Sequence, residues 1–74
     1  ADREDVRKKL IQFLETSDSP LIQAELIKLL VKRDERSALP TLVRISQDGE
    51  RNETVRELAS WAVATLEEEA NATI

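Results

Sequence analysis

The sequence predicts an all-α fold, because of its composition, the spacing of its apolar residues and its internal similarity. Helix-favouring residues such as Ala, Leu, Glu, Lys and Arg dominate the 74 residues, whereas Gly occurs once and aromatic side chains amount to 3%. Strand-forming residues are therefore scarce. Apolar residues recur at helical spacing in four segments, which are separated by short turn-like sequences. A chain of this length allows one small domain.

The first expected helix covers residues 3–15, with Asp2 as its N-cap. Its apolar residues follow the spacing of one helix face, and they are Val6, Leu10, Ile11, Phe13 and Leu14. This helix is therefore predicted to be amphipathic. The first ten residues carry seven charges and no apolar segment, so we expect no signal peptide.

The second expected helix begins at Pro20, after an N-cap at Ser19, and runs to about Lys32. Its main apolar stripe consists of Ile22, Leu26, Leu29 and Leu30. Further apolar residues lie near the opposite side of the helical wheel, and these are Ala24, Ile27 and Val31. Two interpretations stay open: this helix is the central element between two neighbours, or Ile27 and Val31 line a surface for a protein partner or a second copy.

Residues 33–35 form the next expected turn, in which Asp34 caps a third helix that reaches about Gln47. The apolar residues of this helix are Leu39, Leu42, Val43 and Ile45. Pro40 lies inside the pattern and removes one backbone hydrogen bond. It therefore predicts either a kink after Leu39 or a helix whose regular part begins at Pro40.

The fourth expected helix follows a loop at residues 47–51, in which Gly49 is expected to supply a left-handed C-cap. Asn52 caps the helix, which runs to about Glu69. The apolar residues on one side of its helical wheel predict the core face, and they are Val55, Leu58, Ala59, Ala62 and Leu66.

Trp61 lies at the flank of this core face, about 60° from Leu58 on a wheel of 100° per residue. Two interpretations stay open for it: packing at the edge of the core, or an exposed interface residue. Residues 70–74 follow three consecutive glutamates, which oppose the negative end of the helix dipole. We therefore predict that this tail frays.

The chain is similar to itself at a shift of about 33 residues. This shift aligns Leu10 with Leu42, Ile22 with Val55, and Leu26 with Ala59, when one residue of slippage is allowed in a loop. A helix pair repeated at this period is typical of an α-solenoid. An ordinary four-helix bundle remains the alternative. We expect two antiparallel helix hairpins, at residues 2–33 and 34–69, stacked within one domain of residues 1–69.

Three segments of the sequence resemble HEAT-type repeats. They are residues 19–23, which open a helix, residues 36–42 with their in-helix proline, and residues 52–56, which open the last helix. The resemblance covers residues 2–69 and implies a short HEAT-like α-solenoid that binds proteins. The paired Asp and Arg of such repeats are matched by Asp48 and Arg56, whereas Gln23 stands where the first repeat would carry Arg.

Within this superfamily the chain is most similar to the C-terminal HEAT-type tandem of some bacterial membrane-anchored anti-sigma proteins. Those proteins carry a zinc-binding inhibitor domain elsewhere in their chains. Because this sequence has no Cys and no His, neither zinc binding nor sigma-factor inhibition carries over to any of its residues. The resemblance leaves the compartment open between the cytoplasm and an extracytoplasmic location.

The composition argues against catalysis and against most ligand classes. The absence of Cys and His excludes ordinary zinc sites, and a single Gly cannot form a phosphate-binding loop. No nucleophile with a base in reach can be assembled. The net charge of -4 is opposite to that of a nucleic-acid-binding surface. No apolar run is long enough to span a membrane.

The net charge lies entirely in the second half, because residues 37–74 contain three basic and seven acidic side chains. This asymmetry could steer a basic protein partner, or it could serve solubility alone.

We therefore expect a non-catalytic protein-protein interaction module, interpreted as the HEAT-like fragment of a larger bacterial regulatory or signalling protein. The alternative is an autonomous homo-oligomeric bundle or scaffold. The expected partner is another protein or a second copy of the chain, with no cofactor, small-molecule substrate, nucleic acid or membrane contact. The candidate partner-binding residues are Gln23, Ile27, Val31, Arg56, Ser60 and Trp61.

Overall fold

The structure is a computed structural model, which describes residues 2–72 and the side chains of residues 4–68. Its elements in chain order are the helices α1 (Asp2–Thr16) and α2 (Pro20–Lys32), the 3-10 turn η1 (Arg36–Ala38), and the helices α3 (Leu39–Gln47) and α4 (Glu53–Ala72). No strand occurs within residues 2–72. The predicted all-α fold with four helices is confirmed.

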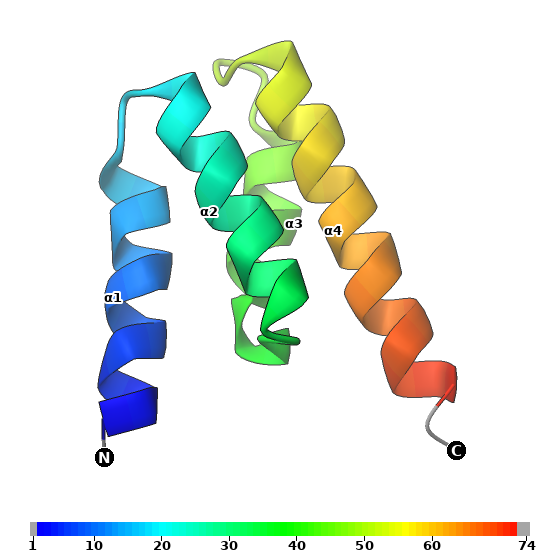
Figure 1. Ribbon diagram of the computed structural model, residues 1–74. Coiled ribbons are helices and arrows are strands. Elements are labelled where there is room, and N and C mark those ends of the chain that lie inside the picture. Colours follow the sequence, from blue (N-terminus) through cyan, green and yellow to red (C-terminus); the bar gives the residue numbers. More distant parts are fainter. Residues whose placement is uncertain (1, 73–74) are drawn as a thin grey trace.

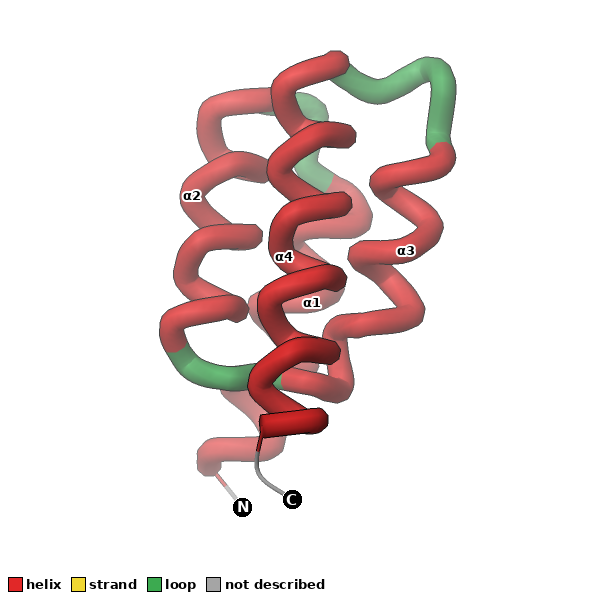
Figure 2. The backbone as a smooth tube through the Cα atoms, turned by 90° about the vertical axis from the view of Figure 1, so that its right-hand side faces the viewer, coloured by secondary structure: helices red, strands yellow, loops and turns green. Residues whose placement is uncertain are grey.

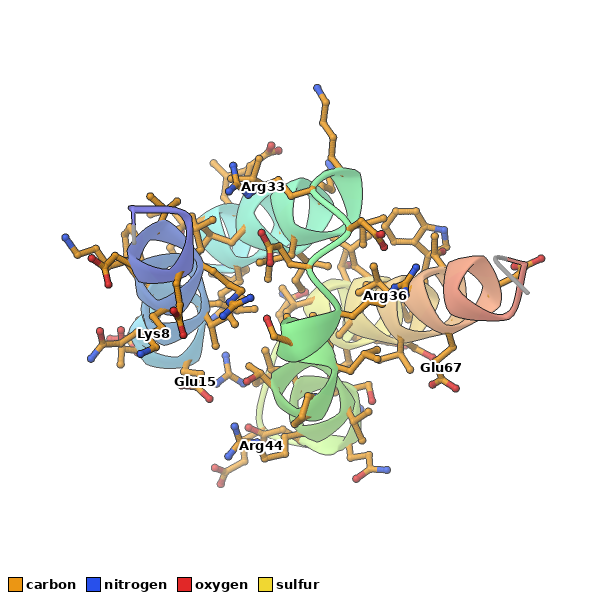
Figure 3. All side chains as sticks on the ribbon, turned by 90° about the horizontal axis from the view of Figure 1, so that it is seen from below. Lys8, Glu15, Arg33, Arg36, Arg44 and Glu67 are labelled. Atoms are coloured by element: carbon orange, nitrogen blue, oxygen red, sulfur yellow. The ribbon has the colours of Figure 1, made fainter. Side chains whose placement is uncertain are left out.

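The helices form two antiparallel hairpins that stand side by side (Figure 1). We call α1 with α2 hairpin one, and α3 with α4 hairpin two. Seen from below, α2 lies between α1 and α4, and α3 lies across from α2 at the bottom of the view (Figure 3). The side view shows α4 in front, with α2 and α3 on either side of it (Figure 2). This arrangement is the predicted short helical solenoid, with α2 as its central element.

Two side-chain caps start α2 and α4 where the sequence places them. Ser19 precedes α2, and its Oγ accepts a hydrogen bond of 3.4 Å from the Ile22 amide. Asn52 precedes α4, and its Oδ1 accepts hydrogen bonds from the amides of Thr54 at 2.8 Å and Val55 at 3.3 Å. Each cap satisfies amides that the first helical turn leaves without an intrahelical partner. Both predicted caps are confirmed.

The prediction that Asp34 caps the third helix is wrong. Asp34 has φ of 54°, the left-handed conformation, and it ends α2. Its amide donates to the Val31 carbonyl, and the Glu35 amide donates to the Leu30 carbonyl, both at 3.0 Å. These two bonds form a Schellman motif, which occupies the last carbonyls of the helix. Asp is tolerated in this conformation because its short polar side chain makes the left-handed region accessible.

Hairpin two begins with η1, and α3 starts only at Leu39. Pro40 therefore lies in the first turn of α3, where its missing amide costs no hydrogen bond. This start agrees with the second interpretation of Pro40, a regular helix that begins beside it. The prediction for Gly49 is wrong, because no glycine in the structure has a positive φ. Instead α3 ends at an extended Asp48, and Gly49 lies in the turn that follows.

One hydrophobic core joins all four helices. Its fully buried centre consists of Leu14, Ile27, Leu30, Ala38, Leu42, Ala59, Ala62 and Leu66. The core face predicted for α4 is confirmed, with Leu58 packed at its margin. The apolar face predicted for α1 is only partly correct, because Val6 and Phe13 are exposed. On the helical wheel both side chains are rotated in the same direction away from Leu14, which is the only fully buried residue described in α1.

The last helix continues to Ala72, past its predicted end near Glu69. Residues 73–74, the rest of the tail that was predicted to fray, lie outside the described residues. A search of the described residues finds no helix with both the length and the apolar character that a bilayer crossing requires.

Candidate protein-interaction surface

Two of the six candidate partner-binding residues lie inside the protein. Ile27 is 0% exposed and Gln23 is buried. The reason is the central position of α2, which packs against both α1 and α4. A helix that packs between two neighbours buries the side chains that face them. The interpretation of Ile27 as a surface residue is therefore corrected, and the interpretation of α2 as the central element is confirmed.

Gln23 and Arg56 occupy equivalent positions in the two hairpins, and each one holds its own hairpin loop. The Gln23 Nε2 donates a hydrogen bond to the Ser17 carbonyl. The Arg56 Nε donates to the Arg51 carbonyl at 3.2 Å. Both loop carbonyls lie near helix ends, where backbone groups lack helical partners. These side chains therefore have a structural task within the chain.

The other three candidates are more accessible. Trp61 is 47% exposed, and Ser60 beside it is exposed as well. Val31 is half-buried and packs against the core. Trp61 is therefore not enclosed by the core, and its indole offers a large contact area to solvent. Exposed Trp side chains of this kind are frequent energetic centres of protein interfaces.

A second group of exposed apolar side chains does not follow from the sequence pattern. Among the described side chains, the large apolar residues that are exposed besides Trp61 are Val6, Phe13, Leu21, Ile22 and Leu29. All five belong to hairpin one. The helical wheels place Val6, Phe13, Ile22 and Leu29 within apolar stripes, so periodicity alone indicates burial. A single helical wheel carries no signal that separates these exposed side chains from the buried ones.

Charged side chains tie hairpin one to α3. Glu15 at the end of α1 accepts hydrogen bonds through Oε2 from Arg44 Nη2 at 2.6 Å and from Thr41 Oγ1 at 3.2 Å. Figure 3 shows Glu15 and Arg44 at the same edge of the molecule. Arg51 Nη2 also donates to the Glu15 carbonyl at 3.3 Å. The Glu15 and Arg44 side chains are exposed enough for solvent to screen the pair, so its main effect is on orientation.

The resemblance implied that Asp48 would pair with Arg56, and this pairing is wrong. Asp48 Oδ2 lies 3.3 Å from Arg51 Nε, three residues further along the chain. Arg56 donates to a backbone carbonyl instead. Arg51 lies in the short loop that follows Asp48, so the two side chains meet within the loop. The charged residues therefore form a local cluster at the loop.

The hollows on the described surface are shallow and charged. One of about 240 Å³ lies between α1 and α3, and its lining residues are Glu15, Thr41, Arg44, Ile45, Asp48 and Arg51. Its charged groups are mutually paired, so that they do not converge on a vacant position. A search of the described residues finds no group of acidic side chains suited to hold a metal ion. The paired charges of this hollow therefore hold α1 and the loop after α3 in position.

The two stacked hairpins agree with a comparison of the sequence with protein families. The family model for HEAT repeats matches residues 7–74, which is most of the chain. The protein belongs to the HEAT repeat family. No curated protein and no solved structure gives a significant match to this sequence. HEAT repeats generally mediate protein-protein interaction, and the family is typically non-catalytic.

Proposed function

We propose that this HEAT repeat protein is a non-catalytic interaction module whose contact surface includes Trp61 with Ser60 and Val31. The exposed indole of Trp61 is the observation that carries the proposal. On the helical wheel Trp61 shares one side of α4 with the half-buried Leu58 and Thr65. Burying this side against a partner would remove apolar surface from water, which stabilises a complex by about 25 cal/mol for each Å² of apolar surface buried.

The charge around this surface supports a basic partner. Residues 37–74 contain three basic and seven acidic side chains. Among the described side chains of α4, the exposed acidic residues are Glu53, Glu57, Glu67 and Glu68. Charges of one sign steer association with a surface of the opposite sign, and they do so less at high salt. The proposed partner is therefore a polypeptide with an apolar contact patch and a basic rim.

Photo-crosslinking from the position of Trp61 tests this proposal. A benzophenone amino acid would replace Trp61 in the native chain, and a matched variant would carry it at Gln12, which is exposed on α1. Irradiation in cells that make the protein is expected to give a discrete adduct with a second polypeptide from position 61 and none from position 12. Because Trp61 is half exposed, its replacement should leave the helical content unchanged.

Two outcomes would contradict the proposal. Equal labelling from both positions would show that α4 has no preferred contact. An adduct of two identical chains would support the alternative function, a homo-oligomeric scaffold. Sedimentation over a concentration series would then give the number of copies.

The resemblance to the HEAT-type tandem of anti-sigma-like proteins supports a finer proposal, namely that the module serves a larger bacterial regulatory chain. The sequence encoded before Ala1 tests it. A membrane span with a Cys and His zinc pattern upstream would support this proposal, and further helix pairs would indicate a longer array instead.

A further inference from the structure

The internal similarity of the chain allows the two hairpins to be compared position by position. Residues of α1 and α3 correspond at a shift of 32, as Leu10 and Leu42 do, and residues of α2 and α4 correspond at 33, as Leu26 and Ala59 do. One face of hairpin two lies in the core shared with hairpin one, with exposed fractions of 0 to 2%. Its residues are Ala38, Leu42, Ile45, Val55, Ala59 and Ala62.

The equivalent positions in hairpin one are also apolar, but most of them face solvent. We call them the outer face, which consists of Val6, Leu10, Phe13, Ile22, Leu26 and Leu29. Phe13 is 53% exposed, Val6 44%, Ile22 40% and Leu29 38%. The same apolar pattern is therefore buried in hairpin two, where hairpin one packs on it, and half exposed in hairpin one, where no other described element covers it.

The opposite end of the molecule differs. Hairpin one reaches the shared core through Leu14, Ile27 and Leu30, which are all 0% exposed. The equivalent positions in hairpin two are Ser46, Ser60 and Val63. They line a shallow hollow between α3 and α4, together with other residues that include Gln47 and Glu67. Polar groups have replaced most of the apolar contacts here.

These two ends have different consequences for stacking. In repeat proteins an end that meets no neighbour requires a polar outer surface, because each repeat covers the apolar face of the next one. The end at Ser46 and Ser60 meets this requirement, and the outer face does not. A second copy stacked head to tail would press the outer face of one chain against the polar end of another. The polar groups there would lose water without gaining partners.

We propose that the outer face is a docking surface for a further helical hairpin of the HEAT type, stacked by the same translation that relates hairpin one to hairpin two. The occupant would present apolar side chains at the positions of Leu14, Ile27 and Leu30. The interface would continue the one already present between the hairpins. This surface is separate from the one at Trp61, so that either proposal can fail alone.

Adding a hairpin to each end of the chain tests the proposal. In one variant a copy of residues 2–33 is placed directly before Asp2, which keeps the repeat period and gives Asp2 the register of Asp34. In the control variant the same copy follows Ile74. The copy at the N-terminal end is expected to raise the urea midpoint of unfolding by about 1 M or more, because the new interface adds to the free energy of unfolding. Urea lowers that free energy by about 1–3 kcal/mol per M. Binding of an apolar dye per chain should stay at the level of the original chain, because the added hairpin covers one outer face and exposes its own.

The control at the other end is expected to leave the midpoint unchanged, because its contact would be polar. A point variant sharpens the assignment: Phe13→Lys in the original hairpin one should remove the gain in the three-hairpin chain. The same substitution should hardly change the midpoint of the original chain, since Phe13 is half exposed there.

Two results would overturn the proposal. Equal midpoints for the two fusions would show that the outer face has no preference for a stacked hairpin. A concentration-dependent dimer of the original chain that Phe13→Lys dissociates would show that a second copy occupies this face. A monomer at all concentrations, together with a higher midpoint for the N-terminal fusion alone, would support it.

Discussion

Hairpin one and hairpin two have the same helix order and similar apolar spacing, yet they bury their side chains to different degrees. In hairpin two the helices α3 and α4 contact each other more extensively than α1 and α2 do in hairpin one. Figure 1 shows α1 diverging from α2 towards the N-terminus. The comparison teaches that equal periodicity does not give equal burial. A helix face is buried only where another element covers it.

The largest effect is expected where hairpin one enters the shared core. Ile27 is fully buried, while its equivalent Ser60 is exposed. Ile27→Ser should cost about 3–5 kcal/mol, because it leaves a cavity and places a hydroxyl in an apolar site. A domain of this size rarely has more than about that stability. Far-ultraviolet circular dichroism should show loss of helix, whereas Ser60→Ala should leave the spectrum unchanged. A folded Ile27→Ser variant would contradict the central position of α2.

The next effect compares Ile45 with its equivalent Phe13. Ile45 is 2% exposed and Phe13 is 53% exposed. Ile45→Ala should lower the free energy of unfolding by about 2–4 kcal/mol, and Phe13→Ala by less than about 1 kcal/mol, although Phe is the larger side chain. Urea unfolding of both variants measures the difference. Equal losses would mean that the outer face is covered in solution.

A smaller effect separates the caps of the two hairpins. Asn52 accepts hydrogen bonds from two amides of α4, the shorter one at 2.8 Å, whereas Ser19 accepts one of 3.4 Å from α2. Asn52→Ala should therefore cost about 1 kcal/mol, and Ser19→Ala about half of that. The urea midpoints of both variants test the order. The reverse order would show that the geometry of the caps does not determine their strength.

The smallest effect concerns the junction between the hairpins, and it has the opposite sign. Asp34 has a φ of 54°, which glycine adopts more easily. Asp34→Gly should raise the free energy of unfolding by roughly 0.5 kcal/mol, since the ion pair of Asp34 with Arg36 is exposed and weak. Gly49→Ala is the matched variant, because a Cβ there would meet no atom within 4 Å. It should stabilise the chain by about 0.4–1 kcal/mol. A decrease for Asp34→Gly would show that its carboxylate matters more than its backbone.

Local sequence signals predicted the element types and several boundaries. Ser19 with Pro20 fixed the start of α2, and Asn52 fixed the start of α4, because each residue acts through bonds within one turn of helix. Asp34 was misassigned because an Asp after a helix can either end that helix or cap the next one. The distinction depends on its backbone conformation, which composition does not show.

The candidate site was less predictable from the sequence than the fold. Gln23 and Ile27 were assigned to a surface, although both side chains are buried where α2 packs between α1 and α4. Trp61 lies at the flank of a helix, where periodicity permits packing or exposure, and the structure leaves it 47% exposed. Such residues depend on contacts between segments that are distant in sequence, and a single helical wheel does not contain those contacts.

The sequence by itself determined four helices, their order, the caps at Ser19 and Asn52 and the similarity of the two hairpins, because all of these follow from short-range hydrogen bonding and apolar spacing. Only the tertiary structure decided which stripe of each helix is covered. It buried Ile27, exposed Phe13, and made one end of the stack apolar and the other polar. The physical reason is that an apolar stripe leaves water only when a second surface packs on it, and the sequence of one helix does not show where that second surface lies.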